Sequence, residues 1–206
     1  MEKVEKDKLT IQKDITALPL FTPIDELAKL KKVDEIDNQL SVTFGDLIIE
    51  SAAESHIKEI AELWANLASI QQLFEKDRYS FKFEGKDWQS FVRRKLEKKN
   101  NLLLVAHNRN SAEVKGFIYL QTITIPSSNL ILKAVVEDLY TKPQYRRQNI
   151  ATYLLNAALS WSKSQSVKHT ELITLAKSKD LSMFYTKYLN SCSKNDKESL
   201  EVVFVL

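Results

Sequence analysis

Glycine and cysteine are scarce in this chain of 206 residues, which contains three glycines and one cysteine. Because Gly45, Gly85 and Gly116 lie far apart, neither a Gly-x-Gly-x-x-Gly dinucleotide loop nor a Walker phosphate loop can form. The single Cys192 excludes an intrachain disulfide and every Cys-x-x-Cys zinc or redox motif. The sequence therefore excludes several common nucleotide and metal sites at the outset.

Long apolar runs are also missing, since none approaches the roughly 18 residues of a membrane helix. The first eight residues mix acidic and basic side chains where a secretory signal needs a basic and then an apolar stretch. A net charge of +3 is too small to indicate a nucleic-acid partner. The hydrophobic fraction of 44% can bury a core, so we expect a soluble cytoplasmic protein without a membrane or nucleic-acid partner. The three histidines are too scattered to predict a metal site.

The chain divides into a charged extension over residues 1–44 and a compact domain over residues 45–206. The extension carries Pro19 and Pro23, and its most regular stretch, Ile24 to Ile36, predicts one short helix. Two roles remain open for it: a solvated tail that packs loosely on the domain, or an arm that binds a partner.

Apolar periodicity predicts the order β-α-α-β-β-β-α-β-α-β within the domain. The predicted strands cover residues 46–52, 102–107, 114–125, 130–140, 171–175 and 200–206, and the predicted helices cover 57–68, 88–99, 149–163 and 180–189. The three tryptophans lie on apolar helix stripes, so we expect them in the core. Strands on both sides of crossover helices imply an α/β (α+β) fold with a mixed sheet and helices on its faces.

One segment combines a strand end, a basic turn and the most regular helix. The strand stops at Thr141, Pro143 prevents its continuation, and Arg146 and Arg147 precede the helix over 149–163. The first amides of a helix lack internal partners and lie at the positive end of its dipole. This geometry predicts a binding site for a pyrophosphate.

The same segment resembles the signature loop of the GNAT superfamily, the acyl-CoA-dependent N-acetyltransferases. The stretch Arg146-Arg-Gln-Asn-Ile-Ala151 matches the pattern Arg/Gln-x-x-Gly-x-Gly/Ala, with Asn149 in place of glycine. Asparagine is among the residues that best tolerate a positive φ angle, so the loop shape is retained. The stretch from Val136 to Leu155 is also similar to spermidine/spermine N-acetyltransferases.

A second stretch resembles the family motif Asn-x-x-Ala-x-x-Phe-Tyr. Phe184 and Tyr185 keep its aromatic pair, while Ser178 and Leu181 replace the asparagine and the alanine. The resemblance implies the GNAT fold, a mostly antiparallel sheet of about six to seven strands, over about three-quarters of the chain. It also implies acetyl-CoA as cosubstrate, no metal, and direct transfer without an acyl-enzyme.

The resemblance assigns site residues position by position. The main chain of Leu139, Tyr140 and Thr141 would pair with pantetheine, the helix-start amides would hold the pyrophosphate, and Tyr185 would protonate the departing thiolate. The implied acetyl-CoA contacts are Leu139, Tyr140, Thr141, Arg146, Arg147, Gln148, Asn149, Ile150, Ala151, Thr152 and Ser178.

The acceptor must lose a proton, because an alkylamine of pKa about 10.4 is almost fully protonated at pH 7. Glu137 is the candidate catalytic residue, which either removes this proton through water or holds the ammonium. Alternatively, Glu137 only pairs with a basic helix residue. Since side chains alternate along a strand, Glu137 and Asp138 should point to opposite faces. The resemblance also implies Asp77 and Tyr79, in the loop after the first helix, as candidate acceptor contacts; the alternative is an ordinary polar loop.

The sequence thus predicts an N-acetyltransferase that acts on a primary amine of a small molecule or peptide. Polyamines, metabolites, antibiotics and protein amines all remain open, and relatives make a homodimer one expected state. An alternative function, suggested by Asn149, Ser178 and Leu181, is a regulatory module that binds CoA without efficient catalysis. A third is a basic interaction domain that uses residues 86–99.

Overall fold

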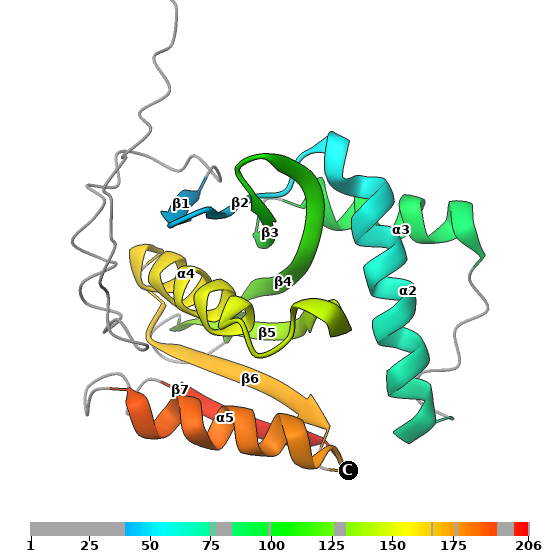
Figure 1. Cartoon of the computed structure of the whole chain (residues 1–206). Coiled ribbons are helices and arrows are strands. Elements are labelled where there is room, and N and C mark those ends of the chain that lie inside the picture. The colour runs from blue at the N-terminus through cyan, green and yellow to red at the C-terminus, as the bar shows by residue number, and fades with distance from the viewer. Residues whose placement is uncertain are drawn as a thin grey trace, which may run out of the picture.

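The structure is a computed structural model that describes residues 40–74, 76, 84–98, 100–125, 131–165, 167–175, 177–192 and 200–205. Figure 1 labels its elements. The strands are β1 (Ser41–Phe44), β2 (Leu47–Ser51), β3 (Asn101–Asn108), β4 (Ser111–Ile125), β5 (Ile131–Thr141), β6 (His169–Leu175) and β7 (Leu200–Val205). The α-helices are α2 (Ile57–Phe74), α3 (Gly85–Leu96), α4 (Ile150–Ser164) and α5 (Lys179–Ser191), with 3-10 turns η1 (Glu54–His56) and η2 (Pro143–Tyr145).

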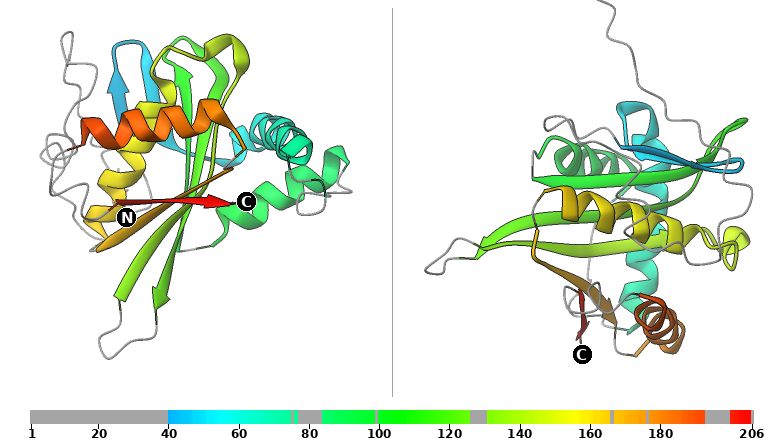
Figure 2. Two further views of the ribbon diagram at one scale, coloured as in Figure 1. Left: turned by 90° about the horizontal axis from the view of Figure 1, so that it is seen from below. Right: turned by 90° about the vertical axis from the view of Figure 1, so that its left-hand side faces the viewer.

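The seven strands form one mixed sheet in the order β1-β2-β3-β4-β5-β6-β7. Neighbours from β1 to β5 are antiparallel, whereas β5, β6 and β7 run parallel. Helices α2 and α3 cover one face, and α4 and α5 cover the other (Figures 1 and 2). The predicted mixed sheet with helices on both faces is confirmed. No described helix combines the length and hydrophobicity that a membrane span requires.

The apolar stripes predicted from the sequence face the sheet. In α2, Ile57, Ile60, Ala61, Trp64 and Ala68 are buried, and they pack with apolar residues of β3 and β4. On the other face, the apolar residues of α4 form the centre of the second core. All three tryptophans are buried, as expected, at positions Trp64, Trp88 and Trp161.

The sheet begins earlier than the sequence pattern predicts. Ser41–Phe44 pairs with Leu47–Ser51 around a two-residue turn, in which Gly45 has a φ of +60°. Glycine is favoured at such a turn position because it adopts positive φ without a steric cost. The predicted boundary before residue 45 therefore falls inside a hairpin, because a strand of four residues leaves too little periodicity to detect. The short helix predicted over Ile24 to Ile36 lies outside the described residues.

Gly116 of β4 lies where the backbone of β5 leaves no room for a side chain. A Cβ atom at this position would lie 2.6 Å from the carbonyl oxygen of Tyr140. We expect Gly116→Ala to lower the free energy of unfolding by about 1–3 kcal/mol, because strand β5 would have to shift. Gly85→Ala is the matched control, since nothing lies within 4 Å of its Cβ. Urea denaturation of both variants tests this, and equal stability of the two would contradict the close approach.

Candidate active site

Strands β5 and β6 separate along part of their length. They pair only from Lys133–Val136 to His169–Leu172, although β5 continues to Thr141 and β6 to Leu175. Their facing backbone groups beyond these pairs have no partner strand, which is rare inside a sheet. The sheet therefore opens between β5 and β6, as the resemblance to an acyl-CoA-binding fold implies.

The turn from β5 to α4 adopts a left-handed backbone twice. Arg147 has a φ of 64° and Asn149 a φ of 61°. Asn149 is the N-cap of α4, but its side chain makes no capping hydrogen bond. The first helical bond of α4 runs from the Tyr153 amide to the Asn149 carbonyl, at 3.0 Å. The amides of residues 150–152 consequently find no acceptor among the described residues, and asparagine keeps the loop shape predicted for the missing glycine.

Polar contacts with β4 hold this turn in place. Glu113 of β4 accepts hydrogen bonds from Lys142 Nζ at 2.8 Å and from the Tyr145 hydroxyl at 2.7 Å. These two donors lower the pKa of Glu113, in that order of importance. Arg146 donates to the Thr141 carbonyl at 3.3 Å, and residues 146–148 are exposed. The turn thus presents exposed basic side chains beside the free helix amides.

Two buried hydroxyl groups lie on the strands that separate. The Oγ1 atoms of Thr141 and Thr174 are buried and have no hydrogen-bond partner. Thr141 ends β5, and Thr174 lies on β6 beyond its last pair with β5. Unsatisfied buried hydroxyls are costly, so they mark a place that suits a polar ligand. Together with the open strand edges and the free helix amides, they fit the amide-rich arm and the pyrophosphate of coenzyme A.

A β-bulge corrects the expectation for Glu137 and Asp138. Tyr119 pairs with Asp138 while the next residue, Leu120, pairs with Val136, so Glu137 is an extra residue in β5. A bulge interrupts the alternation of side chains along a strand. As a result both carboxylates face the α2 and α3 layer, and the prediction that they point to opposite faces is wrong.

Glu137 is held through both carboxylate oxygens. Its Oε2 accepts from Lys95 Nζ of α3 at 3.3 Å, and its Oε1 accepts from the amide of Gln121. The Lys95 ammonium also lies 4.3 Å from the centroid of the Tyr119 ring and 5.3 Å from that of Phe91. The contact with a basic helix residue, considered from the sequence as an alternative, is therefore present.

Asp138 is the second carboxylate, and its surroundings differ from those of Glu137. Its Oδ2 accepts a hydrogen bond from Trp64 Nε1 at 3.1 Å, and Gln71 of the same helix is a second donor. Burial, and next the charge of Glu137, raise the pKa of Asp138 to about 6. The described residues contain no ion pair to Asp138. Sequence reasoning did not select it, although a Glu-Asp pair inside an apolar strand was a visible signal.

Tyr185 of α5 lies in the core on the other face of the sheet. Its side chain is buried in the α4 and α5 core, and its hydroxyl has no hydrogen-bond partner among the residues described. Burial, and next the charge of Asp138, raise the pKa of Tyr185. Tyr185 and Asp138 therefore lie close enough to influence each other across the sheet opening.

Three other predicted site residues have different outcomes. Ser178 is the N-cap of α5, where its hydroxyl accepts from the Leu181 amide at 3.5 Å. Asp77 and Tyr79 lie outside the described residues.

A polar hollow of about 360 Å³ lies near Glu137. Gln121 lines this hollow and also donates a hydrogen bond to Glu137. The lining residues are Lys98, Asn100, Asn101, Gln121 and Thr122.

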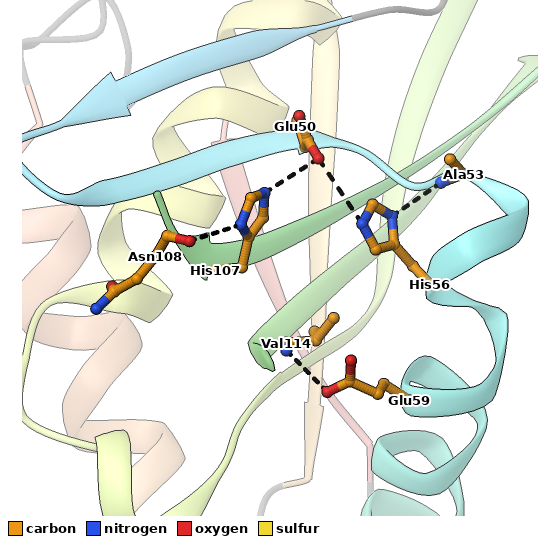
Figure 3. A network of polar contacts seen from close by, with 7 residues as sticks. All are labelled: Glu50, Ala53, His56, Glu59, His107, Asn108 and Val114. Carbon is orange, nitrogen blue, oxygen red and sulfur yellow. Dashed lines mark hydrogen bonds and ion pairs between the residues drawn. The ribbon is translucent and has the colours of Figure 1, made fainter. Parts of the chain in front are cut away.

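Two of the scattered histidines meet at the start of α2 (Figure 3). Glu50 Oε1 lies 3.0 Å from His107 Nε2 and 3.8 Å from His56 Nε2. His56 Nδ1 accepts from the Ala53 amide at 3.1 Å, and burial is the main cause that lowers the pKa of His56. In the described part of the chain, no three His, Cys, Asp or Glu residues are grouped to hold a metal ion. The cluster connects the 3-10 turn η1, which precedes α2, to β2 and β3.

Comparisons with known proteins agree with this architecture. Residues 99–188 match the family model of the Acetyltransferase (GNAT) domain. No curated protein matches the chain, so the similarity to spermidine/spermine N-acetyltransferases stays a prediction.

Solved structures share the fold at low identity. A transcriptional regulator from Bacillus halodurans C-125 is 20% identical, with a TM-score of 0.57 over 68% of this chain and 90% of that one. A predicted acetyltransferase from Clostridium acetobutylicum, solved with acetyl-CoA, is 18% identical, with a TM-score of 0.55 over 69% and 88%. An aminoglycoside acetyltransferase from an uncultured soil metagenomic sample is 18% identical, with a TM-score of 0.53 over 74% and 88%. Residues 99–188 of this chain are thus similar to the Acetyltransferase (GNAT) domain, and the solved structures share the fold.

Proposed function

We propose that the chain transfers an acetyl group from acetyl-CoA directly to a primary amine. The observation that carries this proposal is the opening between β5 and β6 beside an uncapped helix start. An extended ligand with amide groups can pair with a free strand edge, and a diphosphate suits the first amides of a helix. The two ligand-binding features belong to one continuous segment, residues 137–152.

Acetyl-CoA would be held by the residues that the family resemblance assigns. The main chain of Leu139, Tyr140 and Thr141 would bind the pantetheine arm, and the amides from Arg147 to Thr152 would bind the pyrophosphate. The exposed Arg146, Arg147 and Gln148 would add charge and donors at the phosphates. The bound thioester supplies the activated acetyl group, so no covalent acyl-enzyme is required. Cys192, the one cysteine, lies at the C-cap of α5.

The acceptor enters as an ammonium ion and must react as a free amine. At pH 7 about one alkylamine molecule in 10³ is unprotonated, which is an obstacle of roughly 4–5 kcal/mol. The carboxylate of Glu137 would attract the ammonium and orient it, in competition with Lys95. Tyr185 would donate a proton to the thiolate that leaves. Asp77 and Tyr79 remain proposed acceptor contacts.

A binding module without efficient catalysis is the second candidate function. It is favoured by Ser178, whose hydroxyl caps α5 and so is engaged within the protein. The basic interaction domain over residues 86–99 has less support, because Arg93 pairs with Glu54 and Lys95 pairs with Glu137. Cofactor binding without turnover would support the binding module.

The proposal is tested by acetyl-CoA consumption in the presence of an amine panel. The panel contains spermidine, an aminoglycoside, free amino acids and a lysine peptide, and release of the CoA thiol is measured. We expect at least one amine to be acetylated, and Glu137→Gln to lower kcat/KM for that amine by 10-fold or more with little change in the acetyl-CoA Kd. Binding of acetyl-CoA without transfer to any amine would favour the second candidate. An unchanged kcat/KM in Glu137→Gln would remove Glu137 from the mechanism.

A further inference from the structure

Among the charged groups of the described residues, Asp138 has unusual surroundings. Its side chain is partly buried between the seven-stranded sheet and helix α2. Buried carboxylates normally have a cationic partner, because a buried charge without one is costly. Asp138 instead receives neutral donors, the Trp64 indole at 3.1 Å and the side chain of Gln71. Such an arrangement lowers stability and is typical of a site where the group has a chemical task.

The charged and titratable groups around Asp138 come from four elements. Glu137 of β5 opposes its ionisation, and Lys95 of α3 favours it. Tyr119 of β4 and Tyr185 of α5 both have pKa values raised in part by the charge of Asp138. Helix α2 contributes only the neutral donors. Asp138 is therefore coupled to both layers of the fold.

Within the described part of the chain, Glu137, unlike Asp138, forms an ion pair with a cationic side chain. Both of its oxygens already accept hydrogen bonds, one from an ammonium group and one from an amide. This arrangement suits the attraction of a cation, which is the role proposed above for Glu137.

Asp138 also lies in the part of β5 that is not paired with β6. The last pair between β5 and β6 joins Val136 and Leu172, so Asp138 is the second residue inside the opening. The bulge at Glu137 turns Asp138 toward the α2 layer, whereas Tyr185 approaches from the α5 layer. A thioester held between β5 and β6 would thus have Asp138 on one side and Tyr185 on the other.

We propose that Asp138, rather than Glu137, accepts the proton from the acceptor amine during acetyl transfer. This inference rests on the proposed function. The ammonium ion first releases one proton to water; the nitrogen of the free amine then forms a bond to the acetyl carbon, and the carbon–sulfur bond breaks. The proton of the amine passes to Asp138, and the Tyr185 hydroxyl proton passes to the sulfur, which leaves as the CoA thiol. Asp138 then releases its proton to water, and water reprotonates Tyr185.

The electrostatics of the site support this role. An aspartate with a pKa of about 6 is ionised at pH 7, and it is a stronger base than an ordinary aspartate. Protonation below that pH would stop the reaction. The rate should therefore fall on the acidic side with an apparent pKa near 6.

The first experiment compares Asp138→Asn with Asp180→Asn, an exposed aspartate of α5 that serves as the matched control. Asparagine keeps an oxygen that can accept from Trp64, so the fold should persist. With the amine found in the panel, we expect Asp138→Asn to lower kcat by 100-fold or more. Its Kd for acetyl-CoA should stay within twofold, and Asp180→Asn should match the wild type.

The acidic limb of the pH–rate profile should remain in Glu137→Gln and disappear in Asp138→Asn. A wild-type rate and limb in Asp138→Asn would overturn the assignment.

A second experiment needs no acceptor. Because the Trp64 indole donates to Asp138, protonation of this carboxyl should change tryptophan fluorescence. We expect a transition near pH 6 in the wild type, a transition at lower pH in Glu137→Gln because the charge of Glu137 raises the pKa of Asp138, and none in Asp138→Asn. The same transition in Asp138→Asn would contradict the proposal. If acetyl-CoA binds but no amine is acetylated, the proposed function fails and the assignment fails with it, whereas active Asp138→Asn protein refutes the assignment alone.

Discussion

Replacing Tyr185 with phenylalanine should slow acetyl transfer about 100-fold without loss of fold stability. The departing thiolate would lose its proton donor, and the ring would keep its packing against α4. The Tyr185 hydroxyl makes no hydrogen bond to the described residues, so its removal breaks none of them. Steady-state kinetics at saturating substrates and thermal unfolding measure the two effects separately.

Tyr188→Phe is the control for this prediction, because it removes a buried hydroxyl from the same helix. The Tyr188 hydroxyl donates to Asn156 Oδ1 at 2.6 Å. Its loss should lower the free energy of unfolding by about 1 kcal/mol or more and leave kcat nearly unchanged. If Tyr185→Phe keeps the wild-type rate, Tyr185 is a packing residue and the proton donor lies elsewhere.

Asn149→Val should reduce acetyl-CoA affinity at least 10-fold. Asn149 has a φ of 61°, a backbone conformation that a β-branched residue adopts only with strain of about 1–3 kcal/mol. Relief of that strain would rotate the turn and misplace the amides at the start of α4. Asn149→Gly keeps the left-handed conformation, so its affinity should equal or exceed that of the wild type.

Isothermal titration of acetyl-CoA into both variants measures this contrast. Circular dichroism shows whether α4 remains folded in Asn149→Val. Equal affinity in the valine and glycine variants would mean that the backbone of this turn does not hold the diphosphate.

The layered fold was predictable because its signals are local. The stripe on α2 and the apolar α4 have the helical period, and Pro143 followed by Arg146 and Arg147 marks the turn before α4. The left-handed backbone at Asn149 was also predictable, since asparagine tolerates that conformation. Local patterns thus located the turn and the helix start that form half of the candidate site.

The other half of the candidate site depends on how the strands pair, and a single sequence does not reveal this pairing. The bulge at Glu137 arises from the register between β4 and β5, so strict alternation along β5 placed Asp138 on the wrong face. The donors to Asp138 come from Trp64 and Gln71, more than 60 residues away in the chain. Trp64 was expected only as a core residue, and it is both a core residue and a donor to this carboxylate.

Titration of ¹⁵N-labelled protein with coenzyme A tests the central claim most directly, because amide NMR signals report binding at each residue. The account predicts the largest shifts at the amides of residues 150–152, with further shifts at residues 139–141 on the free edge of β5. The histidine cluster around Glu50 should stay unperturbed. No shifts at millimolar coenzyme A, or shifts confined to another face of the sheet, would contradict a coenzyme site between β5 and β6.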